Sequence, residues 1–84
     1  GAVVEHDCVV GDGVHISPGA VACGGCAVGE RAWLGAASCV RELVVIGEGA
    51  LVGAGAVVVS DVPDGTRVVG VPARPLTDGR DAKC

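Results

Sequence analysis

The sequence contains no phenylalanine, tyrosine or methionine, and Trp33 is its single aromatic residue. Small domains usually fill their cores with large aromatic side chains, so a core here must be built from Val, Ile, Leu and Ala in thin, repeated layers. Half of the 84 residues are hydrophobic and fifteen are glycine. The many valines exclude a disordered chain, and the irregular glycine spacing excludes collagen. A chain of this length forms one domain at most.

Other common features are also missing. The chain starts at Gly1 rather than at methionine, so we expect a processed product, an excised piece or a fragment of a longer protein. No basic stretch precedes a short apolar run, as a signal peptide requires. No run of about 18 apolar residues lacks glycine or charge, so we expect no membrane span. The net charge of −4 and the scattered basic residues argue against nucleic-acid binding.

A six-residue repeat runs from residue 1 to residue 60 without a gap. The second position of each block is small and the fourth is apolar. Eleven of the twelve glycines in this stretch occupy the first or fifth position. Because side chains alternate along a strand, positions two and four share the inner side, and glycine at positions one and five marks the bends. Each block is therefore a short strand followed by a corner. The ten fourth positions are Val4, Val10, Ile16, Ala22, Val28, Leu34, Val40, Ile46, Val52 and Val58.

This pattern resembles the hexapeptide-repeat acyltransferases, in which three blocks make one triangular coil of a left-handed parallel β-helix. The resemblance covers residues 1–72 and implies an all-β fold of about three coils, with residues 18 apart stacked on one another. We expect residues 1–60 to form the β-helix, residues 61–72 a closing loop segment that begins with a turn, and residues 73–84 a polar C-terminal tail. The resemblance also implies an N-terminal sugar-nucleotide-binding domain, which we expect to be absent from this chain.

The outward third position of the repeat is apolar on two faces. Large exposed apolar patches mark interfaces, and the family forms trimers with active sites between chains, so we expect a homotrimer. The alternative is that a further part of the chain covers these faces. The outward residues are Val3, Val21, Cys39 and Val57 on one face, and Val9, Ala27 and Val45 on another.

The string VVEHDCVVGDGVHISPGAVACGG contains both histidines of the chain. It is similar to the core motif of the bacterial sialic-acid O-acetyltransferase and UDP-4-amino-sugar N-acetyltransferase group (NeuD type). The resemblance implies that His6 is the general base and that Asp7 raises its basicity. It further implies that His15 contacts acetyl-CoA, and that the backbone at Ala36 and Ala54 lines the coenzyme groove.

The residue types fit these roles. Acetyl transfer needs a base that titrates near neutral pH, which is the property of an imidazole, and a neighbouring carboxylate can hold its tautomer and stabilise the imidazolium. Neighbours on a strand point apart, so a contact between His6 and Asp7 requires a corner or a subunit boundary. Trp33 lies one coil above His15 and suits a wall of the groove or an interface. A lone surface histidine is, however, more often incidental, and Asp7 also fits a turn.

Five cysteines are present, and Cys23 and Cys26 form a Cys-x-x-Cys pair. Such a pair suggests a redox site or half of a zinc site. The repeat explains Cys26 as a small interior residue, and no second pair or histidine cluster completes a zinc site. We therefore expect reduced thiols in the cytoplasm and no metal. Carbonic anhydrases of the same fold need three metal-binding histidines. Because only two histidines are present here, we do not expect that activity.

The sequence thus predicts an acetyl-CoA-dependent acetyltransferase that acts on an amino or hydroxyl group of a nucleotide-linked or sialic-acid-type sugar. His6 would take the proton as the sugar attacks the thioester directly. The alternative is a non-catalytic trimeric β-helix that serves as a scaffold. The choice between N- and O-acetylation stays open.

Overall fold

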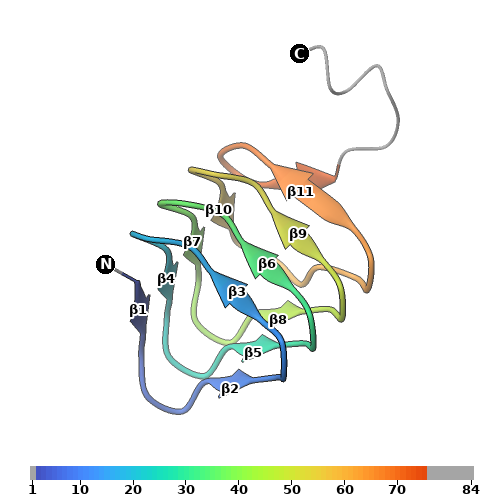
Figure 1. Ribbon diagram of the computed structural model, residues 1–84. Coiled ribbons are helices and arrows are strands. Elements are labelled where there is room, and N and C mark those ends of the chain that lie inside the picture. Colours follow the sequence, from blue (N-terminus) through green and yellow to red (C-terminus); the bar gives the residue numbers. More distant parts are fainter. Residues whose placement is uncertain (1, 76–84) are drawn as a thin grey trace.

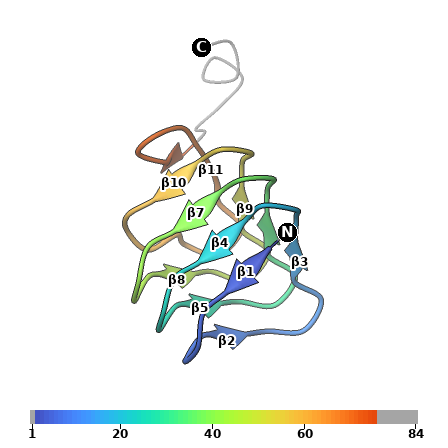
Figure 2. The same cartoon turned by 90° about the vertical axis from the view of Figure 1, so that its left-hand side faces the viewer.

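The computed structural model describes residues 2–75, which form a triangular prism of stacked β-coils (Figures 1 and 2). Strands of two or three residues alternate with tight corners, and each coil contributes one strand to each of three faces. The predicted all-β fold is confirmed. Within residues 2–75 no helix is long and apolar enough to cross a membrane.

Each face is one sheet, and we name the sheets A, B and C. Sheet A contains β1 (Val3–Val4), β4 (Val21–Ala22), β7 (Cys39–Val40) and β10 (Val57–Val58). Sheet B contains β2 (Val9–Val10), β5 (Ala27–Val28) and β8 (Val45–Ile46). Sheet C contains β3 (His15–Ile16), β6 (Trp33–Leu34), β9 (Leu51–Val52), β11 (Arg67–Val69) and β12 (Arg74–Pro75). The corners between them are the A–B, B–C and C–A corners.

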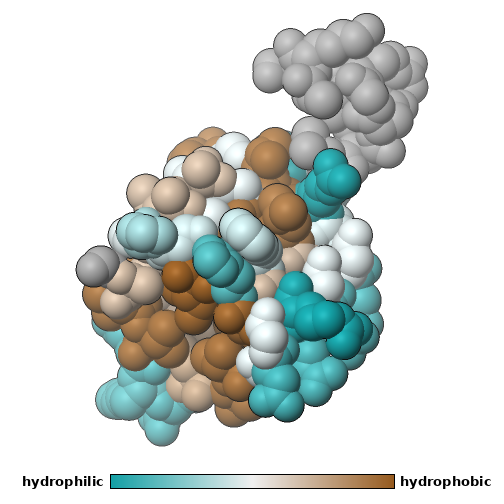
Figure 3. All heavy atoms as spheres, in the orientation of Figure 1, coloured by the Kyte–Doolittle hydropathy of each residue, from teal (hydrophilic) through white to brown (hydrophobic). Residues whose placement is uncertain are grey.

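The expected stacking of residues 18 apart is confirmed for the first ten strands, all of which pair in parallel in that register. Positions two and four of the repeat face inward and fill the prism with aliphatic side chains. The first coil is the exception, because Val4 is 42% and Val10 is 40% exposed at the end of the prism. In Figure 3 apolar side chains gather over this end, inside the triangle of β1, β2 and β3.

Corners use the two glycine positions for different reasons. The first position of a block adopts a positive φ, whether it holds glycine, as Gly25 does at 75°, or another residue, as Leu43 does at 65°. The fifth position brings the backbones of two coils together. A Cβ on Gly35 would lie 2.6 Å from the Ala54 nitrogen and 2.7 Å from the Val52 oxygen. The first position thus imposes a conformational requirement, whereas the glycine at position 35 meets a steric one.

The segment expected to be a closing loop instead completes a fourth coil. Val62 pairs with Ile46 and Val68 with Val52, so both stack at a spacing of sixteen residues rather than eighteen. Because this coil is shorter, the Val45 amide faces a side chain instead of a backbone carbonyl. The amide donates a hydrogen bond to Asp61 Oδ1 at 2.9 Å. A carboxylate therefore takes the place that a carbonyl of the next coil has in the regular coils, where the Ala27 amide donates to Val44 at 3.0 Å.

After β11 the chain turns back and pairs β12 antiparallel to it. The same turn covers β10, because Val57 donates to the Gly70 carbonyl at 3.0 Å and accepts from the Ala73 amide at 2.7 Å. The last coil is thus capped by the chain itself. The tail predicted for residues 73–84 therefore begins with strand residues, and residues 76–84 lie outside the described part of the chain.

We predict that Gly35→Ala destabilises the fold far more than Gly49→Ala. The new methyl group at residue 35 meets backbone atoms that cannot move alone, which should lower the free energy of unfolding by about 3 kcal/mol. Gly49 has a φ of 68° but open space around it, so its replacement should cost about 1 kcal/mol. Urea unfolding measures both values. Equal losses in the two variants would contradict the steric role of the fifth position.

We also predict that Ser38→Ala stabilises the protein. Ser38 lies 1% exposed between Ala20 and Ala56 in one inward column, and its Oγ has no hydrogen-bond partner. A buried hydroxyl without a partner costs free energy, so its removal should raise the free energy of unfolding by about 1 kcal/mol. Ala56→Ser is the matched control and should lower it. Destabilisation by Ser38→Ala would show that the hydroxyl has a partner.

Candidate functional site

His6 and Asp7 both lie exposed at the A–B corner, between β1 and β2. Asp7 is the positive-φ residue of this corner, at 66°. The preceding Glu5 braces the corner against the next coil, because its Oε1 accepts a hydrogen bond from the Gly24 amide at 3.2 Å. Among the hydrogen bonds of residues 2–75, none joins the His6 ring to the Asp7 carboxylate. The corner therefore brings the two residues together in the chain and leaves both side chains open to a partner.

His15 points outward from sheet C, where its ring stacks on that of Trp33. The ring centroids lie 3.9 Å apart with an angle of 22° between the planes. Leu51 continues the same outward column on β9. Trp33 is 46% and Leu51 is 38% exposed. Sheet C therefore presents a column that begins with an imidazole and continues with two large apolar side chains, and the predicted position of Trp33 above His15 is confirmed.

Ala36 and Ala54 stack at the C–A corner, which borders the outer face of sheet C. The Gly55 amide donates to the Ala36 carbonyl at 2.8 Å and fixes one corner above the other. Within the described residues the amides of Ala36 and Ala54 donate to no backbone carbonyl, and both residues are exposed. Pro18 has the same place one coil below and has no amide hydrogen. Two free donors with small side chains thus lie along this corner.

One chain does not bring all five predicted site residues together. His15, Ala36 and Ala54 share one side of the prism, formed by sheet C and the C–A corner. His6 and Asp7 lie at the A–B corner, which is the corner opposite sheet C (Figure 1). The base predicted from the sequence and the residues predicted to contact the coenzyme are therefore separated by the body of the prism.

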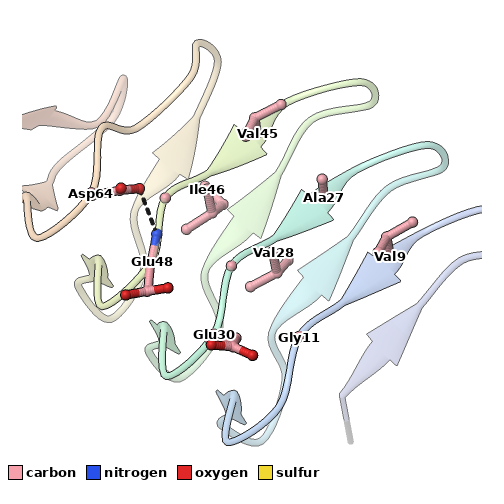
Figure 4. A pocket seen from close by; sticks show the side chains of 11 residues that line it. Val9, Gly11, Ala27, Val28, Glu30, Val45, Ile46, Glu48 and Asp64 are labelled. Atoms are coloured by element: carbon pink, nitrogen blue, oxygen red, sulfur yellow. Dashed lines mark hydrogen bonds between the residues drawn. The ribbon is translucent and has the colours of Figure 1, made fainter.

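A shallow groove of about 450 Å³ follows the outer face of sheet B and the B–C corner. Figure 4 shows Val9, Ala27 and Val45 along the apolar part of the groove, and Glu30 and Glu48 at the corner. Two of the carboxylates at this corner, those of Glu48 and Asp64, already have partners. The Glu48 amide donates to Asp64 Oδ1 at 2.7 Å, and the Glu48 side chain pairs with Arg31 at 3.1 Å. None of the site residues predicted from the sequence lines this groove. Its acidic corner was not predicted either, although Glu30 and Glu48 occupy the same position of the repeat and therefore stack on one another.

The Cys26 thiol lies in the interior, and the Cys8 thiol lies against the backbone, where its Sγ donates to the Cys23 carbonyl at 3.1 Å. Burial raises the pKa of both the Cys26 and the Cys23 thiol, and nearby thiols raise both further. Cys26 Sγ also donates to the Arg41 carbonyl at 2.9 Å. A raised pKa disfavours the thiolate that redox and metal chemistry need. In residues 2–75 no three His, Cys, Asp or Glu side chains are grouped to hold a metal ion.

The chain matches no protein-family model, but it is similar to several acetyltransferases. A histidine-to-asparagine mutant of perosamine N-acetyltransferase from Caulobacter crescentus, in complex with CoA and GDP-perosamine, has a TM-score of 0.91 and 47% identity over 92% of this chain and 37% of that chain. The acetyltransferase domain of PglB from Neisseria gonorrhoeae, in complex with acetyl coenzyme A, has a TM-score of 0.74 and 32% identity over 89% of this chain and 54% of that chain. Serine acetyltransferase from Bacillus pumilus is 37% identical over 82 residues, which cover 88% of this chain and 38% of the relative.

The chain thus spans between about a third and a half of the length of these relatives. The predicted left-handed β-helix is confirmed by its likeness to the acetyltransferase structures. Enzymes with different acceptors share this likeness, which therefore leaves the acceptor open. In its six-residue repeat, its three stacked sheets and its sequence, the chain is similar to the hexapeptide-repeat acetyltransferases.

Proposed function

We propose that this chain carries the acetyl-transfer machinery of an enzyme that moves an acetyl group from acetyl-CoA to an amino or hydroxyl group of a nucleotide-linked sugar. The observation that carries the proposal is the pair of free amides at Ala36 and Ala54 beside the outward His15. Exposed backbone donors next to small side chains suit the amide groups of a pantetheine arm. Relatives of this fold have been crystallised with CoA or acetyl coenzyme A.

His6 is the proposed general base. The sugar nucleophile attacks the thioester carbonyl as His6 removes its proton, a C–N or C–O bond forms, and the C–S bond breaks. The coenzyme leaves as a thiolate and takes up the proton. An exposed imidazole at a corner is free to meet a substrate, and Asp7 can orient the ring or stabilise the imidazolium once the two side chains turn toward each other.

The placement of the residues supports a site shared between two copies of the chain. His6 and His15 are on opposite sides of one prism, so a second copy has to bring its sheet C side to the A–B corner of the first. Sheet A lies between the A–B and C–A corners and has an apolar outer face of valines and Cys39. Three copies with sheet A inward join the A–B corner of each to the C–A corner of the next, in a closed ring. This is the expected homotrimer.

The acceptor is a nucleotide-linked sugar, with the NeuD-type group as the proposed subfamily. Support comes from the relative that was crystallised with GDP-perosamine. We expect an N-terminal domain outside this chain to bind the nucleotide. The proposed location of the enzyme is the cytoplasm. A non-catalytic scaffold is the competing function, and it requires neither His6 nor coenzyme binding.

We predict that His6→Gln lowers kcat for acetylation of a UDP- or GDP-linked amino sugar by roughly 10² to 10⁴-fold, as expected for loss of a general base. The dissociation constant for acetyl-CoA should stay the same, because a general base contacts the attacking amino or hydroxyl group of the sugar rather than the coenzyme. His15→Ala is the matched variant and should weaken acetyl-CoA binding. Steady-state kinetics and calorimetry measure both effects. Full activity in His6→Gln would remove His6 from the mechanism, and absence of acetyl-CoA binding to the parent protein would favour the scaffold.

A shared site also predicts subunit complementation. His6→Ala chains lack the base and His15→Ala chains bind acetyl-CoA weakly, so neither variant alone should be active at a low acetyl-CoA concentration. A mixed trimer, however, contains one interface in which an intact His6 faces an intact His15. Random mixing should therefore restore about a quarter of the parent activity, because three trimers in four are mixed and each regains one site of three. A mixture of His6→Ala with His6→Gln is the control and should stay inactive. No recovery in the first mixture would place the whole site within one chain.

A further inference from the structure

We infer that the groove along the outer face of sheet B binds an amphipathic α-helix of a partner protein. The apolar side of this helix lies on β2, β5 and β8, and its basic residues lie against the B–C corner. The inference goes beyond acetyl transfer, because none of the site residues predicted from the sequence lines the groove. It specifies an interaction surface and the chemistry of the partner that fits it.

The groove consists of two rows of side chains with bare backbone between them. The apolar row is formed by outward residues of successive coils, Val9, Ala27 and Val45, and the acidic row at the corner includes Glu30 and Glu48 (Figure 4). Between the rows, the outward position on each of the first three coils is a glycine: Gly11, Gly29 and Gly47. Because glycine has no side chain, the backbone forms the floor of the groove and a ligand can reach both rows.

The apolar row is exposed and is lowest in its middle. Val9 is 69% and Val45 is 47% exposed, and the smaller Ala27 lies between them. Exposed apolar side chains that stack on three successive coils form a continuous strip, which is typical of an interaction site rather than of scattered surface residues. A branched aliphatic side chain of a partner therefore fits over Ala27, between the two valines.

The acidic row favours a cationic partner. The B–C corner carries Asp12, Glu30, Glu48 and Asp64, one carboxylate on each coil. Arg31 is the basic residue of this corner, and it pairs with Glu48 at 3.1 Å. The negative charge is therefore only partly compensated, and it attracts basic side chains and repels acidic ones. Long basic side chains also suit the glycine floor, because their methylene groups can cover it while the charged end reaches the carboxylates.

The spacing of the apolar row fits an α-helix better than an extended strand. Val9 and Val45 are two coil spacings apart, which is about 9.6 Å. Side chains seven residues apart on one side of a helix are about 10.5 Å apart, with a third side chain between them. Three side chains on one face of a strand cover about 13 Å. A helix laid along the prism therefore places one apolar side chain on each coil, and its flanking residues face the acidic row.

The groove stays accessible in the proposed homotrimer, and this step alone rests on the proposed function. The trimer places sheet A inward and joins A–B corners to C–A corners. The B–C corner is the corner opposite sheet A, so each chain presents its groove on the outside of the ring. A bound helix leaves sheet C uncovered, and coenzyme and partner can therefore bind to the same chain.

The test measures the binding of three labelled synthetic peptides of about 14 residues, a length that covers the described coils. The first has Leu at helical spacing, flanked by Lys. The second has the same composition, rearranged so that Leu and Lys alternate as in a strand. The third is the helical peptide with Glu in place of Lys. Fluorescence anisotropy should show a dissociation constant for the first peptide at least about tenfold lower than for the other two, since only this peptide matches both the spacing and the charge of the groove.

Variants of the groove test the location of the binding site. Val45→Lys introduces a like charge into the apolar row and should weaken binding of the first peptide by about tenfold or more. The double variant Asp12→Asn/Glu30→Gln should weaken it by about fivefold and reduce its dependence on salt. Val71→Lys is the matched control, because Val71 is 73% exposed in the turn between β11 and β12, and it should leave binding unchanged. Glu42→Gln is the control for loss of an exposed carboxylate at the A–B corner.

The outcomes also separate the inference from other occupants and from the proposed function. Equal binding of the three peptides, or binding that Val45→Lys does not change, would overturn the inference. Sedimentation should give the same molar mass for the parent protein and Val45→Lys, whereas a lower mass for the variant would assign the groove to a second copy of this chain. The dissociation constant for acetyl-CoA is measured in the same proteins and should be equal in both, so a failure of coenzyme binding is observed independently of peptide binding.

Discussion

The structure depends on backbone hydrogen bonds between successive coils, which hold the coils at the strand spacing of about 4.8 Å. Each coil must therefore copy the path of the one below. This constraint limits inward side chains to small and aliphatic ones, because the prism has no room for larger groups. It also favours a positive φ at the corners of the six-residue repeat and removes the Cβ where two corner backbones meet closely, as at Gly35. The repeat in the sequence is a record of these requirements.

Most of the fold could be predicted because the requirements recur every six residues. The inward columns, the outward position of Trp33 and the two kinds of corner glycine all follow from the repeat. The fourth coil could not, since it is two residues shorter and uses the Asp61 side chain to satisfy the Val45 amide. A replacement of a backbone acceptor by a side chain leaves no periodic signal. Of the site, the motif indicated His6, Asp7 and His15, but not their separation by the prism.

The three corners of the prism therefore carry different chemical groups. The A–B corner carries an imidazole and a carboxylate, the C–A corner carries free amides and no charge, and the B–C corner carries acidic residues. A solenoid can hold such different edges because each corner residue is largely free of the packing inside. The interior fixes the path of the chain, and the chemistry can vary at the corners without a change in the core.

The stack of Trp33 on His15 has a consequence for how the protein can be observed. Because the chain has no other tryptophan and no tyrosine, all of its near-ultraviolet fluorescence arises from one indole in contact with one imidazole. The emission is therefore a local signal from the outer face of sheet C rather than an average over the molecule. Near-ultraviolet light absorbed by this indole therefore reports on the part of sheet C beside which the coenzyme is proposed to lie.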